Sequence, residues 1–246
     1  MRIVVVTPCH NESDYLPFTY QGVMSQESKP DLWIIVDDRS TDATPKLIVD
    51  YGKESRIRVV RKDDPFIHGD GSFQAFRFGV SKIDRAPDLI MKLDADTVLP
   101  PDYVEEILTR FEEDPSLGIA SGVCEEEKGA GHHPRGNNRV YRWACFSQIP
   151  FPTSGLGWDT IDEEYSKESG WKVKLFQDIQ VKHLRSRLSD LSYRFQQGMV
   201  SNYLGYTLWF AFGRAVKIAL DSGLAQGVAY LKGYKKGGYG MIDPSL

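Results

Sequence analysis

Two carboxylates, Asp94 and Asp96, stand one residue apart in the segment Lys92-Leu93-Asp94-Ala95-Asp96, which follows the apolar residues 89–91. Paired acids at the end of a buried strand are costly as a structural feature, because like charges repel and burial penalises each of them. A divalent cation would remove this cost and could tie the pair to a diphosphate, since hard cations take carboxylate and phosphate oxygens together. The segment therefore predicts a site for a metal ion and a phosphorylated ligand.

Two more polar clusters follow apolar runs earlier in the chain. Thr7-Pro8-Cys9-His10-Asn11-Glu12 follows the first run, and Asp37-Asp38-Arg39-Ser40-Thr41-Asp42 follows the second. The first could present its main chain and Glu12 to a nucleotide, or could simply cap a helix. In the second, Asp38 could accept a hydrogen bond from a base imide or a ribose hydroxyl. Capping explains Thr41 or Asp42 but leaves the two adjacent aspartates unexplained.

Strand and helix patterns alternate along the first half of the chain. Strands are expected at 3–7, 32–36, 57–60, 89–93 and 117–123, and helices at 13–25, 42–51, 72–83 and 102–113, the last opened by a capping pair of Asp102 and Glu105. This alternation predicts βαβ crossovers and a mainly parallel sheet. Ligands of such sheets bind at the carboxyl ends of the strands, which is where the polar clusters fall.

The second half has a different pattern. We expect a loop at 125–138, a short amphipathic segment at 139–147, a helix starting near Asp159, and short strands at 173–176 and 179–183. From 189 to 231 the pattern is helical. The prediction is an α/β fold in residues 1–188, with a nucleotide half at 1–125 and an acceptor half at 126–188. A small helical extension occupies 189–246.

Composition narrows the classes of function. The 246 residues carry a net charge of −4, so general attraction to nucleic acid is not expected. Three widely spaced cysteines without a CxxC pattern indicate a reducing compartment and no zinc site. The first strand begins at once, which argues against a signal peptide and favours the cytoplasm. Residues 196–213 lack charge but contain Gln, Ser and Asn, so a packed helix is favoured over one lying on the inner membrane face.

The three polar motifs, in this order and spacing, resemble those of family-2 glycosyltransferases with the GT-A fold. The common forms in that family are Tyr-Asn-Glu and Asp-Asp-Gly-Ser-Thr-Asp, followed by Asp-x-Asp. This chain has His10 in place of the common Tyr and Arg39 in place of the common Gly. Neither change removes a carboxylate. The likeness covers roughly the first 125 residues.

The resemblance implies a role for each cluster. Glu12 and Asp38 would contact the base or ribose of a nucleotide-diphosphate sugar, and Asp94 would lie near the ribose. Asp96 would bind Mg²⁺ or Mn²⁺ bridging the two phosphates, which neutralises charge on the leaving group. Gly71, after Gly69 and Asp70, would let the main chain approach the donor. The expected nucleotide-sugar contacts are Thr7, Pro8, Glu12, Asp38, Gly71 and Asp94.

The acceptor half supplies candidates for the base and for a second metal ligand. Asp159 aligns with the Asp of the family's Glu-Asp pair, with Trp158 in place of the Glu, and would deprotonate the acceptor in an inverting displacement. Asp162 is the alternative base, and helix capping is the alternative role for Asp159. By the same resemblance His183, after a late strand, would complete the metal site, although such a histidine is often structural.

The remaining candidates bear on the partners. Trp158 could stack on a sugar. His68 could serve the donor or be a solvated loop residue. Arg185 and Arg187 could reach a diphosphate or a lipid phosphate. The basic stretch His132–Arg142 could grip a phosphorylated acceptor, and a solvated face is the alternative for it. A glycan or lipid-linked acceptor is expected. The C-terminal aromatic residues could face lipid or a second copy. A nucleotidyltransferase and a non-catalytic nucleotide-sugar-binding module stay open as other functions.

Overall fold

The computed structural model describes residues 1–64, 70–125, 133–155, 157–185 and 191–237. The chain divides into two compact units. The first contains residues 1–153 and 158–184, and the second contains residues 154–157 and 185–246. Predicted sites at His68, Gly69, His132 and Arg187 lie outside the described residues.

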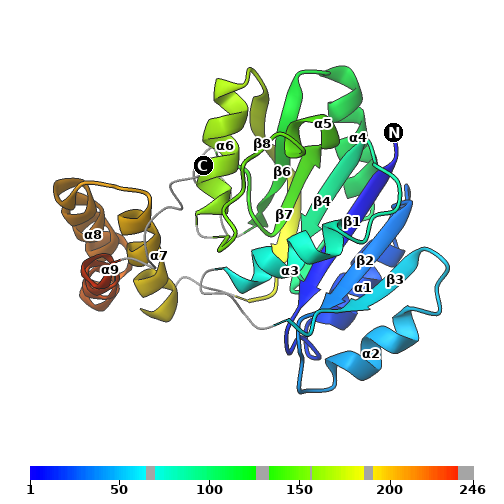
Figure 1. Ribbon diagram of the computed structural model, residues 1–246, viewed down its shortest axis with the longest axis horizontal. Helices are drawn as coiled ribbons and strands as arrows, with labels where there is room; N and C mark the ends of the chain where they lie inside the picture. The colour runs from blue at the N-terminus through cyan, green and yellow to red at the C-terminus, as the bar shows by residue number, and fades with distance from the viewer. Residues whose placement is uncertain (65–69, 126–132, 156, 186–190, 238–246) are drawn as a thin grey trace. The chain divides into compact units, whose positions relative to one another are not determined.

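The first unit is built on a mixed sheet with the order β3-β2-β1-β4-β7-β6-β8-β5 (Figure 1). β1, β2, β3 and β4 pair in parallel, as the alternation of patterns predicted, and β6 and β8 are also parallel. β7 runs antiparallel to both β4 and β6. The strands are β1 Ile3–Cys9, β2 Leu32–Asp37, β3 Ile57–Arg61, β4 Leu89–Leu93, β5 Thr97–Val98, β6 Leu117–Cys124, β7 Asn138–Arg142 and β8 Lys172–His183.

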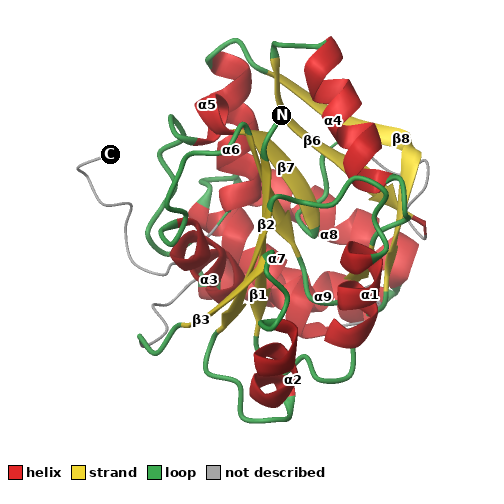
Figure 2. Ribbon diagram, turned by 90° about the vertical axis from the view of Figure 1, so that its right-hand side faces the viewer, coloured by secondary structure: helices red, strands yellow, loops and turns green. Residues whose placement is uncertain are grey.

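Helices cover both faces of this sheet, because the central strands are apolar on both sides (Figure 2). Ile3 and Val5 pack in one core with helices α1, α2 and α4. Val4 and Val6 pack in the other core with α3, α5 and α6. The helices are α1 Leu16–Met24, α2 Thr44–Tyr51, α3 Gly71–Val80, α4 Tyr103–Glu113, α5 Trp143–Phe146 and α6 Trp158–Glu168. The predicted α/β fold with a largely parallel sheet is thereby confirmed.

The segment 139–147, expected to be amphipathic, contains the end of strand β7, with Arg139 and Arg142, and then the short helix α5. β7 is held between β4 and β6 by pairing that the local pattern does not reveal. Two local predictions were wrong. Asp102 precedes α4 but makes no capping bond through its side chain. The two short strands expected at 173–176 and 179–183 are one strand, β8, with an irregularity opposite Gly122 and Val123.

In the described residues of the second unit the helices are α7 Leu191–Tyr203, α8 Leu208–Ser222 and α9 Leu224–Lys236 (Figure 1). Glycines allow α7 and α9 to approach closely: a Cβ atom at Gly198 would lie 2.0 Å from the Tyr230 carbonyl oxygen. The uncharged stretch 196–213 is interrupted between α7 and α8. Within the described residues, none of the helices has the length and apolar character needed to cross a bilayer.

Candidate active site

The carboxyl ends of β2, β1 and β4 are neighbours, so the three sequence clusters meet at one edge of the sheet. Cys9 pairs with Asp37 and Val6 pairs with Lys92 in the strand register. The loops after β1 and β2 brace each other. The Asn11 side-chain oxygen accepts a hydrogen bond from the Thr41 amide at 2.8 Å, and Asn11 donates its own amide to the Ser40 hydroxyl at 3.0 Å.

The two adjacent acids at the end of β2 have different surroundings. Asp37 is buried and accepts hydrogen bonds from the Ser40 amide at 2.9 Å and from Arg61 at 2.7 Å, so it shapes the turn. Asp38 lies beside two cations, with Arg39 Nε at 3.2 Å and Lys62 Nζ at 3.7 Å. Asp37 is therefore explained structurally, and Asp38 is the acid of this pair that stays a ligand candidate.

Thr7 and Pro8, two of the expected nucleotide-sugar contacts, are buried residues of β1. The Thr7 hydroxyl accepts a hydrogen bond from the Trp33 indole N–H at 2.9 Å inside the core. Glu12 is half-buried in the loop that follows β1, and its amide donates to the Thr44 hydroxyl at 2.8 Å. Of the first cluster, the loop beyond Cys9 is the part that can reach a ligand.

Gly71 opens helix α3, and Asp70 caps it by accepting a hydrogen bond from the Phe73 amide at 3.0 Å. The other carboxylate oxygen of Asp70 accepts a hydrogen bond from the Trp158 indole N–H at 3.0 Å. This bond ties the start of α3 to the start of α6.

Asp94 pairs with a lysine that the pattern of acids had not revealed. Lys92 is the fourth residue of β4 and only 3% exposed, and its ammonium group donates a hydrogen bond to Asp94 Oδ1. A cation from the chain itself therefore offsets the charge of one acid of the pair. A divalent cation is thus not the only group that can reduce the repulsion between Asp94 and Asp96. A lysine on the strand that carries an Asp-x-Asp motif is the signal that could have indicated this.

Asp96 lies beside His183. Strand β5, directly after Asp96, pairs antiparallel with β8, and this register sets Thr97 opposite His183. The Leu184 amide donates to the Asp96 carbonyl oxygen at 2.8 Å. The His183 Nε2 atom is 3.2 Å from Asp96 Oδ1, yet it is buried and makes no hydrogen bond to any residue that the structure describes.

A buried imidazole nitrogen that faces a carboxylate oxygen without bonding to it fits a shared divalent cation. Neutral imidazole and carboxylate are both ligands of Mn²⁺, and Mg²⁺ takes carboxylate oxygens with water and phosphate. Within the described residues, no group of three or more His, Cys, Asp or Glu side chains could hold a metal ion by itself. Asp96 and His183 would thus need oxygen ligands from a bound diphosphate or from water.

Asp159 and Asp162 open helix α6 but differ sharply in exposure. Asp159 is exposed, whereas Asp162 is fully buried between Arg139, which contacts both of its oxygens at 2.7 Å, and the Tyr141 hydroxyl at 2.6 Å. Burial raises the pKa of Asp162 against the opposing effect of Arg139. These bonds leave Asp162 no access to an acceptor hydroxyl, so the geometry contradicts the alternative base.

Arg139 holds the first turn of α6 in place. It is 1% exposed and also donates to the Asp159 carbonyl oxygen at 3.1 Å and to Glu163 at 3.1 Å. The predicted basic stretch is therefore not a solvated face at this residue, because the guanidinium is enclosed by carboxylates. Burial alone would lower its pKa, but the combined attraction of Asp162, Tyr141, Asp159 and Glu163 raises it.

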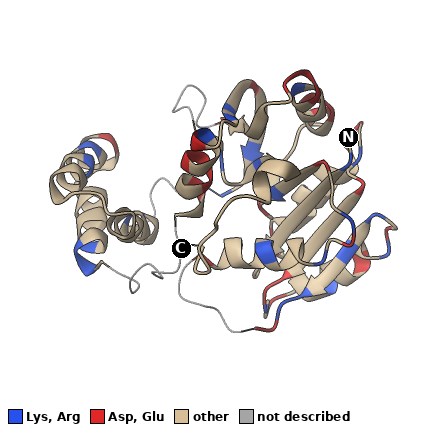
Figure 3. Ribbon diagram, turned by 45° about the horizontal axis from the view of Figure 1, so that its top comes forward, with Lys and Arg blue, Asp and Glu red and all other residues tan. Residues whose placement is uncertain are grey.

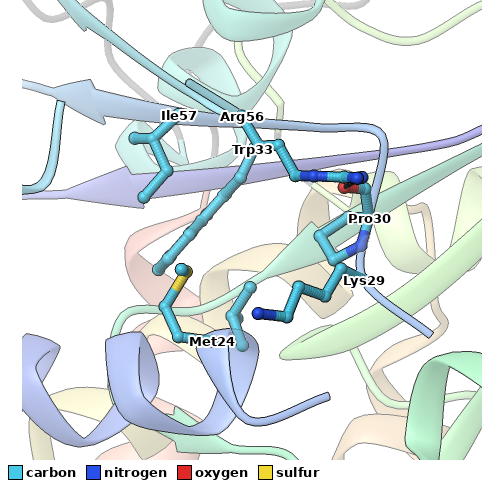
Figure 4. A pocket seen from close by; sticks show the side chains of 7 residues that line it. Met24, Lys29, Pro30, Trp33, Arg56 and Ile57 are labelled. Atoms are coloured by element: carbon cyan, nitrogen blue, oxygen red, sulfur yellow. Dashed lines mark hydrogen bonds between the residues drawn. The ribbon is translucent and has the colours of Figure 1, made fainter. Parts of the chain in front are cut away.

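A separate hollow lies at the opposite, amino-terminal ends of the strands (Figure 4). Its lining includes Met24, Trp33 at the start of β2 and Ile57 at the start of β3. The volume of about 20 Å³ is enough for one water molecule and far too small for a nucleotide. This hollow is therefore not a candidate site for a nucleotide.

The model of one protein family, glycosyl transferase family 2, matches residues 4–161, which is more than half of the chain. The chain belongs to this family. Its curated relatives include the poly-beta-1,6-N-acetyl-D-glucosamine synthases of Staphylococcus aureus (29% identity over 125 residues) and of Staphylococcus epidermidis (30% over 114 residues). These matches cover 49% and 46% of the chain but only 28% and 26% of the relatives' own lengths.

Solved structures show the same fold at low identity. The mannosyltransferase PcManGT of Pyrobaculum calidifontis, solved with GDP-Man and Mn²⁺, gives a TM-score of 0.68 at 16% identity, covering 98% of this chain and 76% of its own. Glucosyl-3-phosphoglycerate synthase of Mycobacterium tuberculosis, solved with Mn²⁺ and UDP, gives 0.61 at 16% identity, covering 82% and 78%. TarS of S. aureus gives 0.61 at 13% identity, covering 90% and 44%.

This family-2 glycosyltransferase departs from the common motif at Arg39, and the backbone shows the consequence. Arg39 has a φ angle of 59°, in the left-handed region that glycine adopts freely. Among the described residues that are not glycine, Asn11 is the other one with a positive φ, at 56°, and asparagine tolerates this region better. Both lie in the loops at the carboxyl ends of β1 and β2, where backbone strain often accompanies function.

Trp158, which stands where the family commonly has Glu, is a packing residue. Its ring stacks on Phe73 with centroids 4.6 Å apart, and the cationic groups of Arg139 and Lys92 lie 5.1 and 5.5 Å from its centroid. The ring is 6% exposed, so the predicted sugar-stacking role is wrong. Since Lys92 also binds Asp94, Trp158 links the helix that carries Asp159 to the edge of the sheet where Asp94 and Asp96 lie.

Proposed function

We propose that this chain is a metal-dependent, inverting glycosyltransferase that moves a sugar from a nucleotide-diphosphate donor to an acceptor hydroxyl. The observation that carries the proposal is the approach of His183 Nε2 to Asp96 Oδ1 at 3.2 Å, beside the loops that bear Glu12 and Asp38. Family membership supports the class of reaction, and this pair of side chains supports the proposed metal site.

Asp96 and His183 would hold Mg²⁺ or Mn²⁺, and the ion would neutralise the charge that develops on the leaving diphosphate. Two solved structures with this fold contain Mn²⁺ together with a nucleotide or nucleotide sugar, which supports a divalent ion. Lys92 orients Asp94 at the same edge. Asp94 would then present its other oxygen to the ribose side of the donor.

The donor's nucleoside would occupy the two braced loops. Asp38 and Glu12 are the hydrogen-bond acceptors there, and Arg39 and Lys62 flank Asp38. Gly71 at the start of α3 offers a main-chain amide without a side chain in the way. The solved relatives bind both UDP and GDP sugars, so both donors belong in the test.

Asp159 is the proposed base. It is exposed, stands in the first turn of α6, and is held by Arg139 through its carbonyl oxygen, which leaves its carboxylate open to an acceptor. A single displacement would take the acceptor proton on Asp159 while the diphosphate leaves from the opposite side of the anomeric carbon, which inverts its configuration. The acceptor is a hydroxyl of a glycan or of a lipid-linked sugar.

The alternatives have less support. A nucleotidyltransferase needs basic groups after the first strand to hold a triphosphate, and the loop from His10 to Ser13 contains no Lys or Arg. A non-catalytic binding module would not require the exposed carboxylate of Asp159. We also propose a cytoplasmic location and a domain boundary at 188. The C-terminal helices would contact the membrane or a second copy of the chain.

A thermal-shift screen of UDP and GDP sugars, each with Mn²⁺, with Mg²⁺ or with a chelator, tests this function. Stabilisation by a ligand grows with its concentration relative to its dissociation constant, so the preferred donor should stand out only when metal is present. Calorimetry on Asp96→Ala should then show loss of metal-dependent donor binding, whereas Asp50→Ala, an exposed acid on α2, should bind like wild type. Equal donor binding by both variants would refute the metal site.

A further inference from the structure

Helix α8 is apolar on two sides, and only one of them is packed. Ala211, Ala215 and Ile218 form its buried side against the rest of the three-helix unit. The residues of the other side follow a three- and four-residue spacing, which places them on one stripe of a helix. This stripe consists of Trp209, Phe212, Val216 and Leu220. Trp209 is 83% exposed and Leu220 82%, which is unusual for large apolar side chains.

The exposed apolar surface continues onto α9 and ends in lysines. Leu224 and Val228 are exposed, and Lys232 and Lys236 follow at the same four-residue spacing, so all four lie along one side of α9. Of the twelve exposed large apolar residues in the described part of the chain, nine lie between Leu191 and Val228. We call the surface formed by Leu208, Trp209, Phe210, Phe212, Val216, Leu220, Leu224 and Val228 the apolar face.

The unit that carries the apolar face is basic, although the chain as a whole is acidic. Residues 185–246 contain eight Lys and Arg against three Asp, whereas residues 1–184 contain 22 Lys and Arg against 31 Asp and Glu. Arg214 and Lys217 on α8 are exposed, as are Lys232, Lys235 and Lys236 on α9. Figure 3 shows several basic segments and little acidic colouring on the helices of this unit.

This charge pattern separates the possible occupants. A second copy of the unit would bring two positively charged surfaces together, which costs energy at an interface. The acidic first unit has few exposed apolar residues to offer in return: within the described residues these are Met1, Phe18 and Val49, which are isolated from one another in the sequence. An anionic lipid surface satisfies both requirements, since apolar residues enter the acyl boundary while Lys and Arg meet the headgroups.

We propose that α8 and α9 bind the surface of an anionic lipid bilayer through the apolar face, with α8 lying in the interface plane. Trp209 and Phe212 would sit at the headgroup level, as aromatic rings do at membrane interfaces. The helix would lie on the bilayer and not cross it, since α8 has 15 residues and about 20 are needed to span. The inference does not rest on the proposed glycosyl transfer, because vesicle binding can be measured without donor or acceptor.

Co-sedimentation of the full chain with vesicles tests the proposal. One vesicle contains only phosphatidylcholine, and the other contains in addition about one third phosphatidylglycerol, the anionic component that basic residues should recognise. Binding should be at least about tenfold tighter to the anionic vesicles and should weaken as salt is raised. Trp209 fluorescence should shift to the blue on binding, and the shift should be lost in Trp209→Phe.

Two sets of variants complete the test. Trp209→Ser/Phe212→Ser/Leu220→Ser should lower binding at least about tenfold. Phe18→Ser/Val49→Ser removes exposed apolar residues of the first unit and should bind like wild type. Because every substituted side chain is exposed, the thermal unfolding of both variants should match that of the wild type. If the triple variant does not fold, Arg214→Gln/Lys217→Gln takes its place, and this variant should bind anionic vesicles more weakly than wild type.

Three results would overturn the proposal. The first is equal binding of the wild type and the triple variant to anionic vesicles, and the second is no binding of the wild type at all. The third is a dimer in analytical ultracentrifugation that the triple variant converts to a monomer without any vesicle binding by the wild type. That last result would assign the apolar face to a second copy of this chain.

Discussion

His183 Nε2 lies 3.2 Å from Asp96 Oδ1, although Asp96 directly precedes β5 and His183 ends β8, far along the chain. The antiparallel pairing of β5 with β8 and the bond from the Leu184 amide to the Asp96 carbonyl oxygen fix this approach. In the described part of the chain the imidazole nitrogen is buried and makes no hydrogen bond, which supports the proposed metal ion in contact with both atoms.

Replacing His183 tests whether its side chain takes part in binding the metal ion. His183→Ala should weaken Mn²⁺ binding in the presence of donor by about 10–100-fold, since it removes one of the two proposed protein ligands of the ion. Titration calorimetry with Mn²⁺ at a fixed donor concentration measures the change. Lys182→Ala, the exposed neighbour on β8, is the matched control. An unchanged Mn²⁺ affinity in His183→Ala would show that His183 is structural.

Substitutions at Asp159 and Asp162 should have different effects, one on the rate of the reaction and the other on stability. Asp159→Asn should lower kcat by about 10²–10⁴-fold, as expected when a general base is lost, with donor binding and stability close to wild type. Asp162→Asn should mainly lower stability, because it breaks the buried contacts with Arg139 and Tyr141. Steady-state kinetics and urea unfolding on both variants decide the matter. If Asp162→Asn is fully stable and loses kcat selectively, the two assignments must be exchanged.

Arg139 should be among the most costly residues to replace. Arg139→Met leaves Asp162 and Glu163 buried without their cation, so the free energy of unfolding should fall by about 3–5 kcal/mol. Arg110→Met, which breaks an ion pair with the more exposed Asp178, should cost less than about 1 kcal/mol. Adding Asp162→Leu to Arg139→Met should restore part of the loss. A loss below about 1 kcal/mol for Arg139→Met would contradict the role given to this network.

The left-handed backbone at Arg39 makes a prediction of its own. Arg39→Gly relieves the strained φ angle, whereas Arg39→Ala keeps it, and both remove the same contact with Asp38. The glycine variant should therefore be more stable than the alanine variant by about 0.5–1 kcal/mol, once the greater freedom of glycine in the unfolded chain is allowed for. Chemical unfolding of the pair gives this difference directly. An alanine variant as stable as the glycine variant would mean that the loop relaxes away from this angle.

The amino-acid sequence by itself determined the local features of this protein. The runs at 3–7, 32–36 and 89–93 are strands, and the acids that follow them were expected at the carboxyl ends of a largely parallel sheet, which the structure confirms. The spacing of apolar residues and the polar residues that end each apolar run carry this information, because both depend only on residues that are close in sequence. The motifs in their order were enough to point to the family, which the family model then confirmed.

Tertiary structure decided which of those polar residues meet, because contacts between distant segments depend on strand register and burial. The pairing of β5 with β8 brings His183 to Asp96, and burial of Lys92 gives Asp94 its own cation. Strand β7, held by pairing on both sides, carries Arg139 into the core, where it encloses Asp162 and leaves Asp159 exposed. A pattern of residues along one segment contains no information on these long-range pairings, so only the fold could separate the two aspartates of α6.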